Sequence, residues 1–246
     1  MKVDLNCDMG ESFGQYKLGD DEAVMPFITS ANIACGFHAG DPQVMQSTIR
    51  LAKKYSVAIG AHPSWPDLQG FGRREMTLSA EETEAVVLYQ IGALAGFAKA
   101  EGVELHHVKP HGALYNQAAK DRILAGAIAR AVRAFSADLI LVGLAGSSLI
   151  EAGVELGLRV ANEGFPDRNY NADGTLASRK QTNAIIESPD EVTAHALLLA
   201  QNGIDFSGQR VKVDTLCLHG DNIRAAENAK QIRDILLQNK ISVEAL

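Results

Sequence analysis

The sequence predicts an α/β fold, specifically a distorted seven-stranded (β/α) barrel. Short apolar runs alternate with longer amphipathic stretches along the whole chain. This pattern is typical of parallel strands joined by crossover helices. The length of 246 residues suits one barrel domain of this kind. Because seven strands are expected rather than eight, a doubly wound open sheet is the alternative.

The expected strands are seven apolar runs, at residues 2–8, 31–37, 57–62, 105–111, 139–145, 159–165 and 214–220. Asp41-Pro42 supplies an N-cap and a first helical proline for the helix after the second run. Ser79-Ala80-Glu81-Glu82 is typical of a capping box, for a helix to about residue 101 that Gly102 closes. Further helices are expected at 116–135, from Ser188-Pro189 onward, and at 222–239.

No linker or shift in composition divides the chain, so residues 1–246 are expected to form a single domain. One segment is irregular. Residues 165–187 are polar and rich in turn residues, and they are too many for an ordinary loop in a compact domain. We expect this segment to form a lid or a hairpin.

The composition narrows the class of protein. With 46% hydrophobic and 22% charged residues, the chain resembles an ordinary globular enzyme. A net charge of -7 argues against a partner that is nucleic acid, and no apolar run approaches the length of a membrane span. Three cysteines without a CxxC pair argue against a disulfide framework and against a cysteine zinc site. The expected location is the cytoplasm.

Polar residues gather where the expected strands end. In a parallel barrel these carboxyl ends meet at one face, and that face holds the active site. Four of the seven histidines belong to this group, so a chance collection of helix caps explains it poorly. The candidates are Asn6, Asp8, Glu11, His38, Asp41, His62, Lys109, His111, Glu163, His219 and Asp221.

Two segments suggest particular chemistry. Arg73 and Arg74 follow a glycine in the long segment 60–76, and guanidinium groups bind carboxylates and phosphates in a bidentate way. For one of the two, a solvated salt bridge is the alternative. Lys109 and His111 are two apart on an expected strand, so both face one side. A lysine there could stabilise an oxyanion while the imidazole moves a proton.

Six stretches, in order, resemble the family of 5-oxoprolinase A subunits, also called LamB/YcsF. They are DLNCDMGESFG, ANIACGFHAGDP, GAHPSWPDLQGFGRR, VKPHGALYN, EGFPDRNY and CLHGD. The resemblance covers essentially the whole chain. Pro166 and Thr182 depart from the residues most frequent in the family, alanine and proline, and both lie in the expected lid.

The resemblance implies a barrel related to the glycoside hydrolase and deacetylase barrels. It also implies that the chain works with two partner subunits, B and C, to open 5-oxoproline to L-glutamate at the expense of ATP. Since the sequence contains no GxxxxGK[ST] motif, ATP with Mg²⁺ is expected on a partner or at a shared interface.

On this interpretation, three roles need residues. Arg73, Arg74 or Lys109 would hold the carboxylate or phosphate of the substrate. Asp8, with His38 or His62, would position and deprotonate water. His111 or His219 would protonate the leaving ring nitrogen, and the other candidates would contact the substrate.

Two other hypotheses stay open. In the first, Asp8, His38, His62 and His219 bind the metal of a metal-dependent amidohydrolase or deacetylase. In the second, the chain is a regulatory or scaffold subunit, and its partners carry all the chemistry.

Overall fold

The computed structural model describes residues 1–178, 181–206, 208–218 and 224–246. In these residues seven parallel strands close into a ring, because β9 pairs with both β6 and β1. This closure confirms the expected seven-stranded barrel and shows that the open sheet is wrong. The strands of the ring, in order, are β1 (Lys2–Met9), β2 (Ser30–Ala34), β3 (Ala58–His62), β4 (His107–Val108), β5 (Ile140–Leu144), β6 (Arg159–Gly164) and β9 (Thr215–Leu218).

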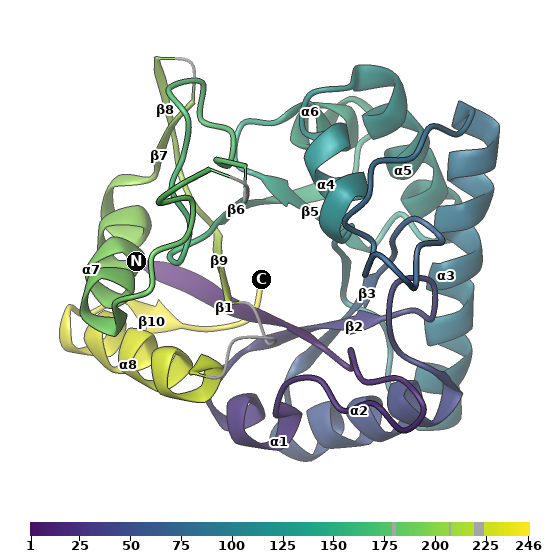
Figure 1. Cartoon of the computed structure of the whole chain (residues 1–246), viewed down its shortest axis with the longest axis horizontal. Helices are drawn as coiled ribbons and strands as arrows, with labels where there is room; N and C mark the ends of the chain where they lie inside the picture. Colours follow the sequence, from purple (N-terminus) through teal and green to yellow (C-terminus); the bar gives the residue numbers. More distant parts are fainter. Residues whose placement is uncertain (179–180, 207, 219–223) are drawn as a thin grey trace.

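Helices surround the ring of strands (Figure 1). The helix α3 (Ala80–Ala100) begins with the expected capping box of Ser79 and Glu82, and Gly102 follows it with a positive φ of 69°. Asp41 caps α2, as its sequence predicts. The other helices are α1 (Asp21–Val24), the short 3-10 helix η1 (Met25–Phe27), α2 (Pro42–Tyr55), α4 (Gly112–Ala118), α5 (Arg122–Phe135), α6 (Ser148–Glu155), α7 (Pro189–Asn202) and α8 (Ala225–Gln238).

The strand β1 shows how the inside of the barrel is built. Alternate residues from Val3 to Met9 join the apolar core that the helices share. The residues between them, Asp4, Asn6 and Asp8, form hydrogen bonds with side chains of other strands. Because side chains alternate along a strand, the KVDLNCDM sequence places one apolar face against the helices and one polar face inside the barrel.

The fourth strand is shorter than the sequence predicts. Only His107–Val108 form β4 out of the expected 105–111. The backbone nevertheless continues alongside β3, because the amides of Lys109 and His111 donate to the carbonyls of Ala61 and Pro63. Pro110 has no N–H to donate between these two bonds. The extended path therefore still carries Lys109 and His111 to the carboxyl end of the barrel.

Two other predicted boundaries are wrong. The strand β2 ends at Ala34 rather than at residue 37, because Gly36, with φ of 91°, turns the chain out of the sheet. The single helix expected over 116–135 is divided into α4 and α5. The carboxylate of Asp121 accepts hydrogen bonds from the amides of Ile123 and Leu124 and starts a new helix there.

Several short elements were not predicted. The strand β10 (Ser242–Val243) pairs with the start of β1, and β7 (Ile204–Phe206) forms an antiparallel hairpin with β8 (Gln209–Val211). Within the segment 165–187, isolated bridges join Arg168 to Ile185 and Tyr170 to Leu176. Its function as a lid stays a prediction. The end of the expected strand 214–220 and the start of the expected helix 222–239 lie outside the described residues.

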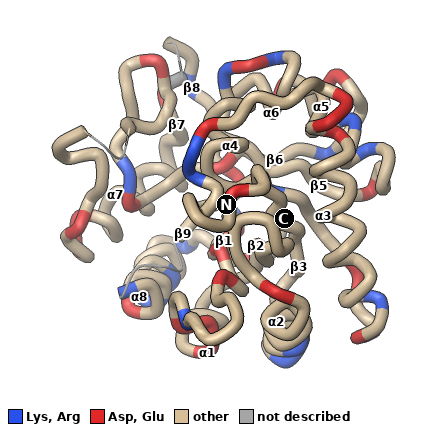
Figure 2. The backbone as a smooth tube through the Cα atoms, turned by 45° about the vertical axis from the view of Figure 1, so that its right-hand side comes forward, with Lys and Arg blue, Asp and Glu red and all other residues tan. Residues whose placement is uncertain are grey.

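Acidic and basic residues are interspersed along the backbone (Figure 2). Among the described residues, no helix has both the length and the apolar character that crossing a membrane requires.

Candidate functional site

Lys109 lies at the centre of a buried polar cluster at the carboxyl end of the barrel. Its Nζ is 2.9 Å from Oδ1 of Asp8 and 2.8 Å from Oε1 of Glu163. It also donates to Oδ1 of Asn6 at 3.2 Å and lies 2.9 Å from the sulfur of Cys217. Burial disfavours the charge of this lysine, but the carboxylates of Asp8 and Glu163 and the hydrogen bond to the sulfur of Cys217 outweigh burial and raise the pKa of Lys109 well above its usual range. The cluster therefore holds a permanent ammonium between two acidic side chains.

Two histidines extend this cluster. Nε2 of His62 is 3.4 Å from Oδ2 of Asp8 and 3.0 Å from Nδ1 of His111. The outer nitrogen of each ring meets a backbone carbonyl, since His62 Nδ1 is 2.7 Å from the oxygen of Lys109 and His111 Nε2 is 2.9 Å from that of Phe71. Both rings are therefore held with one nitrogen directed into the site.

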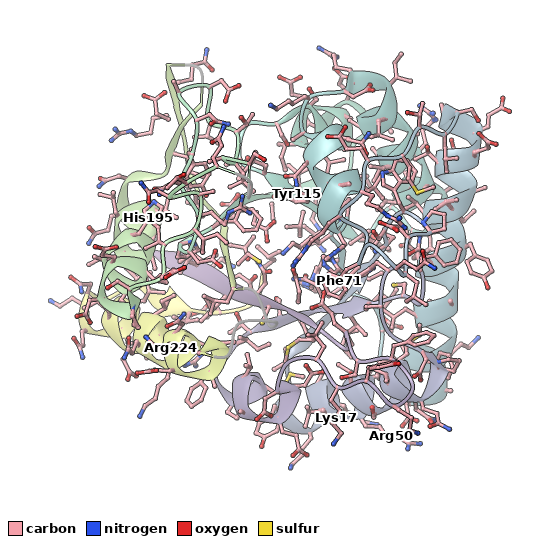
Figure 3. The ribbon with its side chains drawn as sticks, in the orientation of Figure 1. Lys17, Arg50, Phe71, Tyr115, His195 and Arg224 are labelled. Atoms are coloured by element: carbon pink, nitrogen blue, oxygen red, sulfur yellow. The ribbon has the colours of Figure 1, made fainter. Side chains whose placement is uncertain are left out.

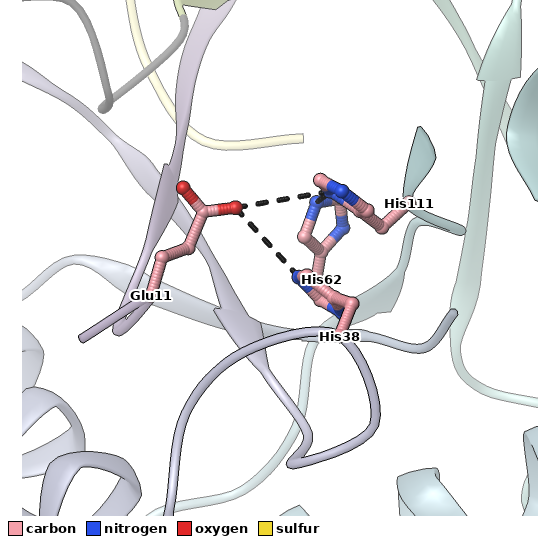
Figure 4. A group of neighbouring side chains, drawn as sticks. All are labelled: Glu11, His38, His62 and His111. Atoms are coloured by element: carbon pink, nitrogen blue, oxygen red, sulfur yellow. Dashed lines mark hydrogen bonds and ion pairs between the residues drawn. The ribbon is translucent and has the colours of Figure 1, made fainter. Parts of the chain in front are cut away.

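Glu11 and His38 lie on the other side of His111. The His38 ring stacks on the His111 ring, with centroids 3.8 Å apart and planes 8° from parallel. Oε1 of Glu11 is 3.7 Å from Nε2 of His38 and 3.8 Å from Nδ1 of His111 (Figure 4). Neither ring nitrogen of His38 has a hydrogen-bond partner among the described residues, although the side chain is fully buried.

Burial also determines the charge of these imidazoles. It lowers the pKa of His38 well below its usual range, and the neighbouring His111 and His62 lower it further. The pKa of His111 is lowered well below its usual range for the same reasons, burial first and His62 second. Both rings are thus neutral near pH 7 and can accept a proton or donate a lone pair.

Glycines allow this close packing. A Cβ on Gly72, which has a positive φ of 64°, would lie 2.8 Å from Cβ of His38 and 2.9 Å from Cδ2 of His111. A Cβ on Gly60 would overlap the ring of His107, which bonds to Asn32 inside the barrel. The segment 60–76 therefore reaches the histidines because its backbone carries no side chain at Gly72.

The structure separates the two predicted arginines. Arg74 is exposed and paired with Asp67, its Nε 2.8 Å from Oδ1. Arg73 lies over the ring of Phe71 at 4.9 Å, and Phe71 in turn packs edge-on against His38 and His111. Figure 3 shows Phe71 near the middle of the molecule and His195 on α7, away from it. Arg73 is therefore the arginine next to the cluster.

The remaining candidates differ in position. Asn6 donates to Glu163 and Thr215 and accepts from Asn32, so it joins three strands inside the barrel. The carboxylate of Asp41 caps α2 and also accepts from the amide of Gly14. His219 and Asp221 lie outside the described residues.

Sequence reasoning missed two members of the cluster. Asn32 donates to Asp8 at 2.9 Å, and its only signal in the sequence is a polar residue within an apolar run. Cys217 is not among the candidates taken from the sequence, but its sulfur contacts the ammonium of Lys109. Burial raises the pKa of this thiol well above its usual range, so it remains protonated.

The arrangement offers a carboxylate fixed by an ammonium, next to neutral imidazoles. Asp8 and a histidine can take a proton from water, while a second histidine can deliver one to a leaving group. Glu11, His38, His62 and His111 also form a potential metal site, because one ligand atom from each lies within 4.8 Å of all the others. This set shares His38 and His62 with the one considered from the sequence, and it contains Glu11 and His111 as well. His219 lies outside the described residues.

The chain is similar to known proteins along its whole length. The model of the LamB/YcsF family matches residues 3–246. A protein from Tolumonas auensis, named as the A subunit of 5-oxoprolinase, is 55% identical and aligns over 100% of this chain and 99% of its own length. The protein of that name from Bacillus subtilis is 52% identical, over 100% and 97%. The crystal structure of a lactam utilization protein from Thermus thermophilus superimposes with a TM-score of 0.92, at 49% identity and full coverage of both chains. The chain belongs to the LamB/YcsF family.

Proposed function

We propose that this chain is the A subunit of a 5-oxoprolinase. The complex opens 5-oxoproline to L-glutamate while it hydrolyses ATP to ADP and phosphate. The full-length similarity to proteins named as 5-oxoprolinase A subunits supports the substrate. The observation that carries a catalytic role for this chain is the buried cluster in which Lys109 joins Asp8 to Glu163 beside two neutral histidines.

The reaction explains why such groups are needed. The lactam of 5-oxoproline is a resonance-stabilised amide that water attacks slowly. Transfer of a phosphoryl group from ATP to its carbonyl oxygen makes the ring carbon more electrophilic. Water then adds to that carbon, and the ring C–N bond breaks as the nitrogen takes a proton. A second water hydrolyses the resulting acyl phosphate and releases L-glutamate and phosphate.

The contacts of Asp8 and His111 support a separate role for each residue in this reaction. Asp8 accepts a proton from the attacking water through Oδ2, the oxygen that faces His62, because Lys109 and Asn32 both contact Oδ1. The proton that Asp8 takes from water then passes through His62 to Nδ1 of His111, since the facing nitrogens of the two rings lie 3.0 Å apart, and His111 delivers it to the leaving ring nitrogen.

Arg73 is the better placed of the two arginines to hold the substrate carboxylate or phosphate, since Arg74 is bound to Asp67. Lys109 keeps Asp8 ionised and in position rather than holding the substrate anion.

The B and C subunits are the proposed partners of this chain in the complex. ATP, with Mg²⁺, binds to a partner or at an interface with one, since this sequence has no GxxxxGK[ST] motif. The complex works in the cytoplasm, where ATP is available.

Glutamate release from 5-oxoproline tests the function. The chain alone, its B and C partners alone, and the full mixture are assayed with and without ATP. Release only in the full mixture with ATP is expected. Release by the chain alone without ATP would instead indicate an ATP-independent amidohydrolase.

Variants test the role of the cluster. In a folded complex, Asp8→Asn and His111→Asn should each lower turnover by roughly 10²–10⁴-fold, the usual contribution of general acid–base catalysis. His195→Asn is the matched control, because this half-buried histidine bonds to the carbonyl of Pro166 on another part of the molecule. If Asp8→Asn and His111→Asn stay as active as His195→Asn, the chain is a scaffold and its partners carry the chemistry.

A further inference from the structure

His62 and His111, at the centre of the site, approach each other through ring nitrogens that lie 3.0 Å apart. A backbone carbonyl can only accept a hydrogen bond, so Nδ1 of His62 and Nε2 of His111 carry the hydrogens that point to Lys109 and Phe71. In neutral rings the remaining nitrogens, His62 Nε2 and His111 Nδ1, carry no hydrogen, so two acceptors face each other across this gap. Two lone pairs at this distance repel unless a positive charge lies between or beside them.

His38 supplies a second, independent observation. Its ring is fully buried against His111, yet neither nitrogen has a hydrogen-bond partner among the described residues. A buried polar group without a partner is costly. Its Nε2 points toward Glu11, but at 3.7 Å the separation is too long for a hydrogen bond. This is the separation that two ligands of one ion adopt.

From these contacts we propose that Glu11, His38, His62 and His111 bind one divalent cation of the zinc class. With metal–ligand bonds of about 2.0–2.1 Å, neighbouring ligand atoms of a tetrahedral ion lie roughly 3.3–3.4 Å apart. Three of the six separations, 3.0, 3.7 and 3.8 Å, lie near that value, and all four ligand atoms lie within 4.8 Å of one another. Movement of the side chains toward a common centre would complete the coordination shell.

The donor set also selects the kind of ion. Three imidazoles and one carboxylate suit Zn²⁺ and similar transition metals, whereas Mg²⁺ prefers oxygen ligands. The carbonyls of Lys109 and Phe71 orient two of the rings in the way that outer partners of metal-binding histidines do. This site is thus distinct from any Mg²⁺ that accompanies ATP. With the cation on His111 Nδ1, Asp8 would both take the proton from water and return it to the leaving nitrogen. The site itself does not depend on the proposed 5-oxoprolinase activity.

Metal binding to the purified full-length chain tests the site directly. After treatment with a chelator, the protein is titrated with Zn²⁺, Co²⁺ and, as a control, Mg²⁺. We expect one Zn²⁺ or Co²⁺ per chain, no stoichiometric binding of Mg²⁺, and the intense visible bands of tetrahedral Co²⁺. Absence of stoichiometric binding by the folded chain would overturn the proposal.

Variants identify the ligands. His38→Ala and His111→Asn should weaken binding by more than the roughly 10–100-fold that loss of an outer partner costs. His195→Asn, outside the cluster, should bind as the unaltered chain does. Unchanged affinity in the first two variants would refute the site. Loss of binding in Asp8→Asn together with full binding in Glu11→Gln would refute the assignment of Glu11.

A measurement without variants covers the case in which these proteins fail to fold. X-ray absorption at the zinc edge of the unaltered chain should show a shell dominated by imidazole nitrogen, and a shell of oxygen atoms alone would contradict the proposal. Because none of these measurements depends on glutamate release, the metal site and the proposed function can fail separately.

Discussion

Replacement of Lys109 by methionine is the sharpest test of how the site is held together. Methionine has a similar length but no charge, so Lys109→Met leaves the carboxylates of Asp8 and Glu163 buried beside each other without their shared ammonium. In the folded chain the ammonium lies 2.9 and 2.8 Å from these two groups. All three side chains are at most 8% exposed.

The expected cost follows from these distances. Two unit charges about 3 Å apart interact by roughly 5–6 kcal/mol at an effective dielectric constant of about 20, before the cost of desolvation is subtracted. Removal of one partner from a buried ion pair costs about 3–5 kcal/mol. We expect a loss of this size in the free energy of unfolding of Lys109→Met. A loss of activity should accompany it, because Asp8 is no longer held in place.

Equilibrium unfolding in urea measures the effect, and two further proteins interpret it. Lys212→Met is the matched control, since Lys212 lies 3.0 Å from Asp214 but is 69% exposed, and an exposed pair contributes about 0–1 kcal/mol. The double variant Lys109→Met/Glu163→Gln should be more stable than the sum of its single changes predicts, by about 0.5–3 kcal/mol. Strict additivity, or equal losses for Lys109→Met and Lys212→Met, would refute the reasoning.

Three other predictions concern packing, chemistry and local structure. In urea unfolding, Gly72→Ala should destabilise the chain by about 1–3 kcal/mol more than Gly14→Ala does. Both glycines have a positive φ, but only at Gly72 would a Cβ meet His38 and His111. Equal losses of stability would contradict this prediction. The thiols of Cys7, Cys35 and Cys217 should not react with Ellman's reagent until the chain is unfolded. All three are buried, and burial raises the pKa of Cys35 to about 12. Rapid reaction of the native protein would show that this prediction is wrong. Asp121→Ala should lower the free energy of unfolding by about 1 kcal/mol, whereas Ser188→Ala, at a helix start without a side-chain cap, should have little effect; a comparable loss at Ser188 would count against the capping argument.

Much of the site could be predicted from where polar residues follow apolar runs. Parallel strands bring their carboxyl ends together whatever their exact lengths. For this reason His62 and Lys109 meet Asp8 even though β4 is only two residues long. The prediction needed the order and direction of the strands, and both are clear from the alternation of strands and helices.

Contacts that depend on register were not predictable. Asn32 reaches Asp8 because β1 and β2 pair with these two residues opposite each other. The apolar pattern excludes a slip by one residue, but a shift by two residues would keep the same faces, so the pattern alone does not fix this contact. Arg74 illustrates the same limit. Its pairing with Asp67 depends on the turn of the segment 60–76, which places the two side chains together.

The polar face of β1 explains how the polar groups of the cluster can be buried. Asp4 accepts hydrogen bonds from Ser30 and Thr215, and Asn6 joins Glu163 to Asn32 one layer above. Asp8 stands on these two layers, and its Oδ1 is held by Lys109 and Asn32. A carboxylate would be expensive to bury in an apolar barrel, but each layer supplies hydrogen-bond donors for the next. The alternation in KVDLNCDM therefore has two consequences: one face builds the core, and the other holds Asp8 in contact with Lys109 and His62.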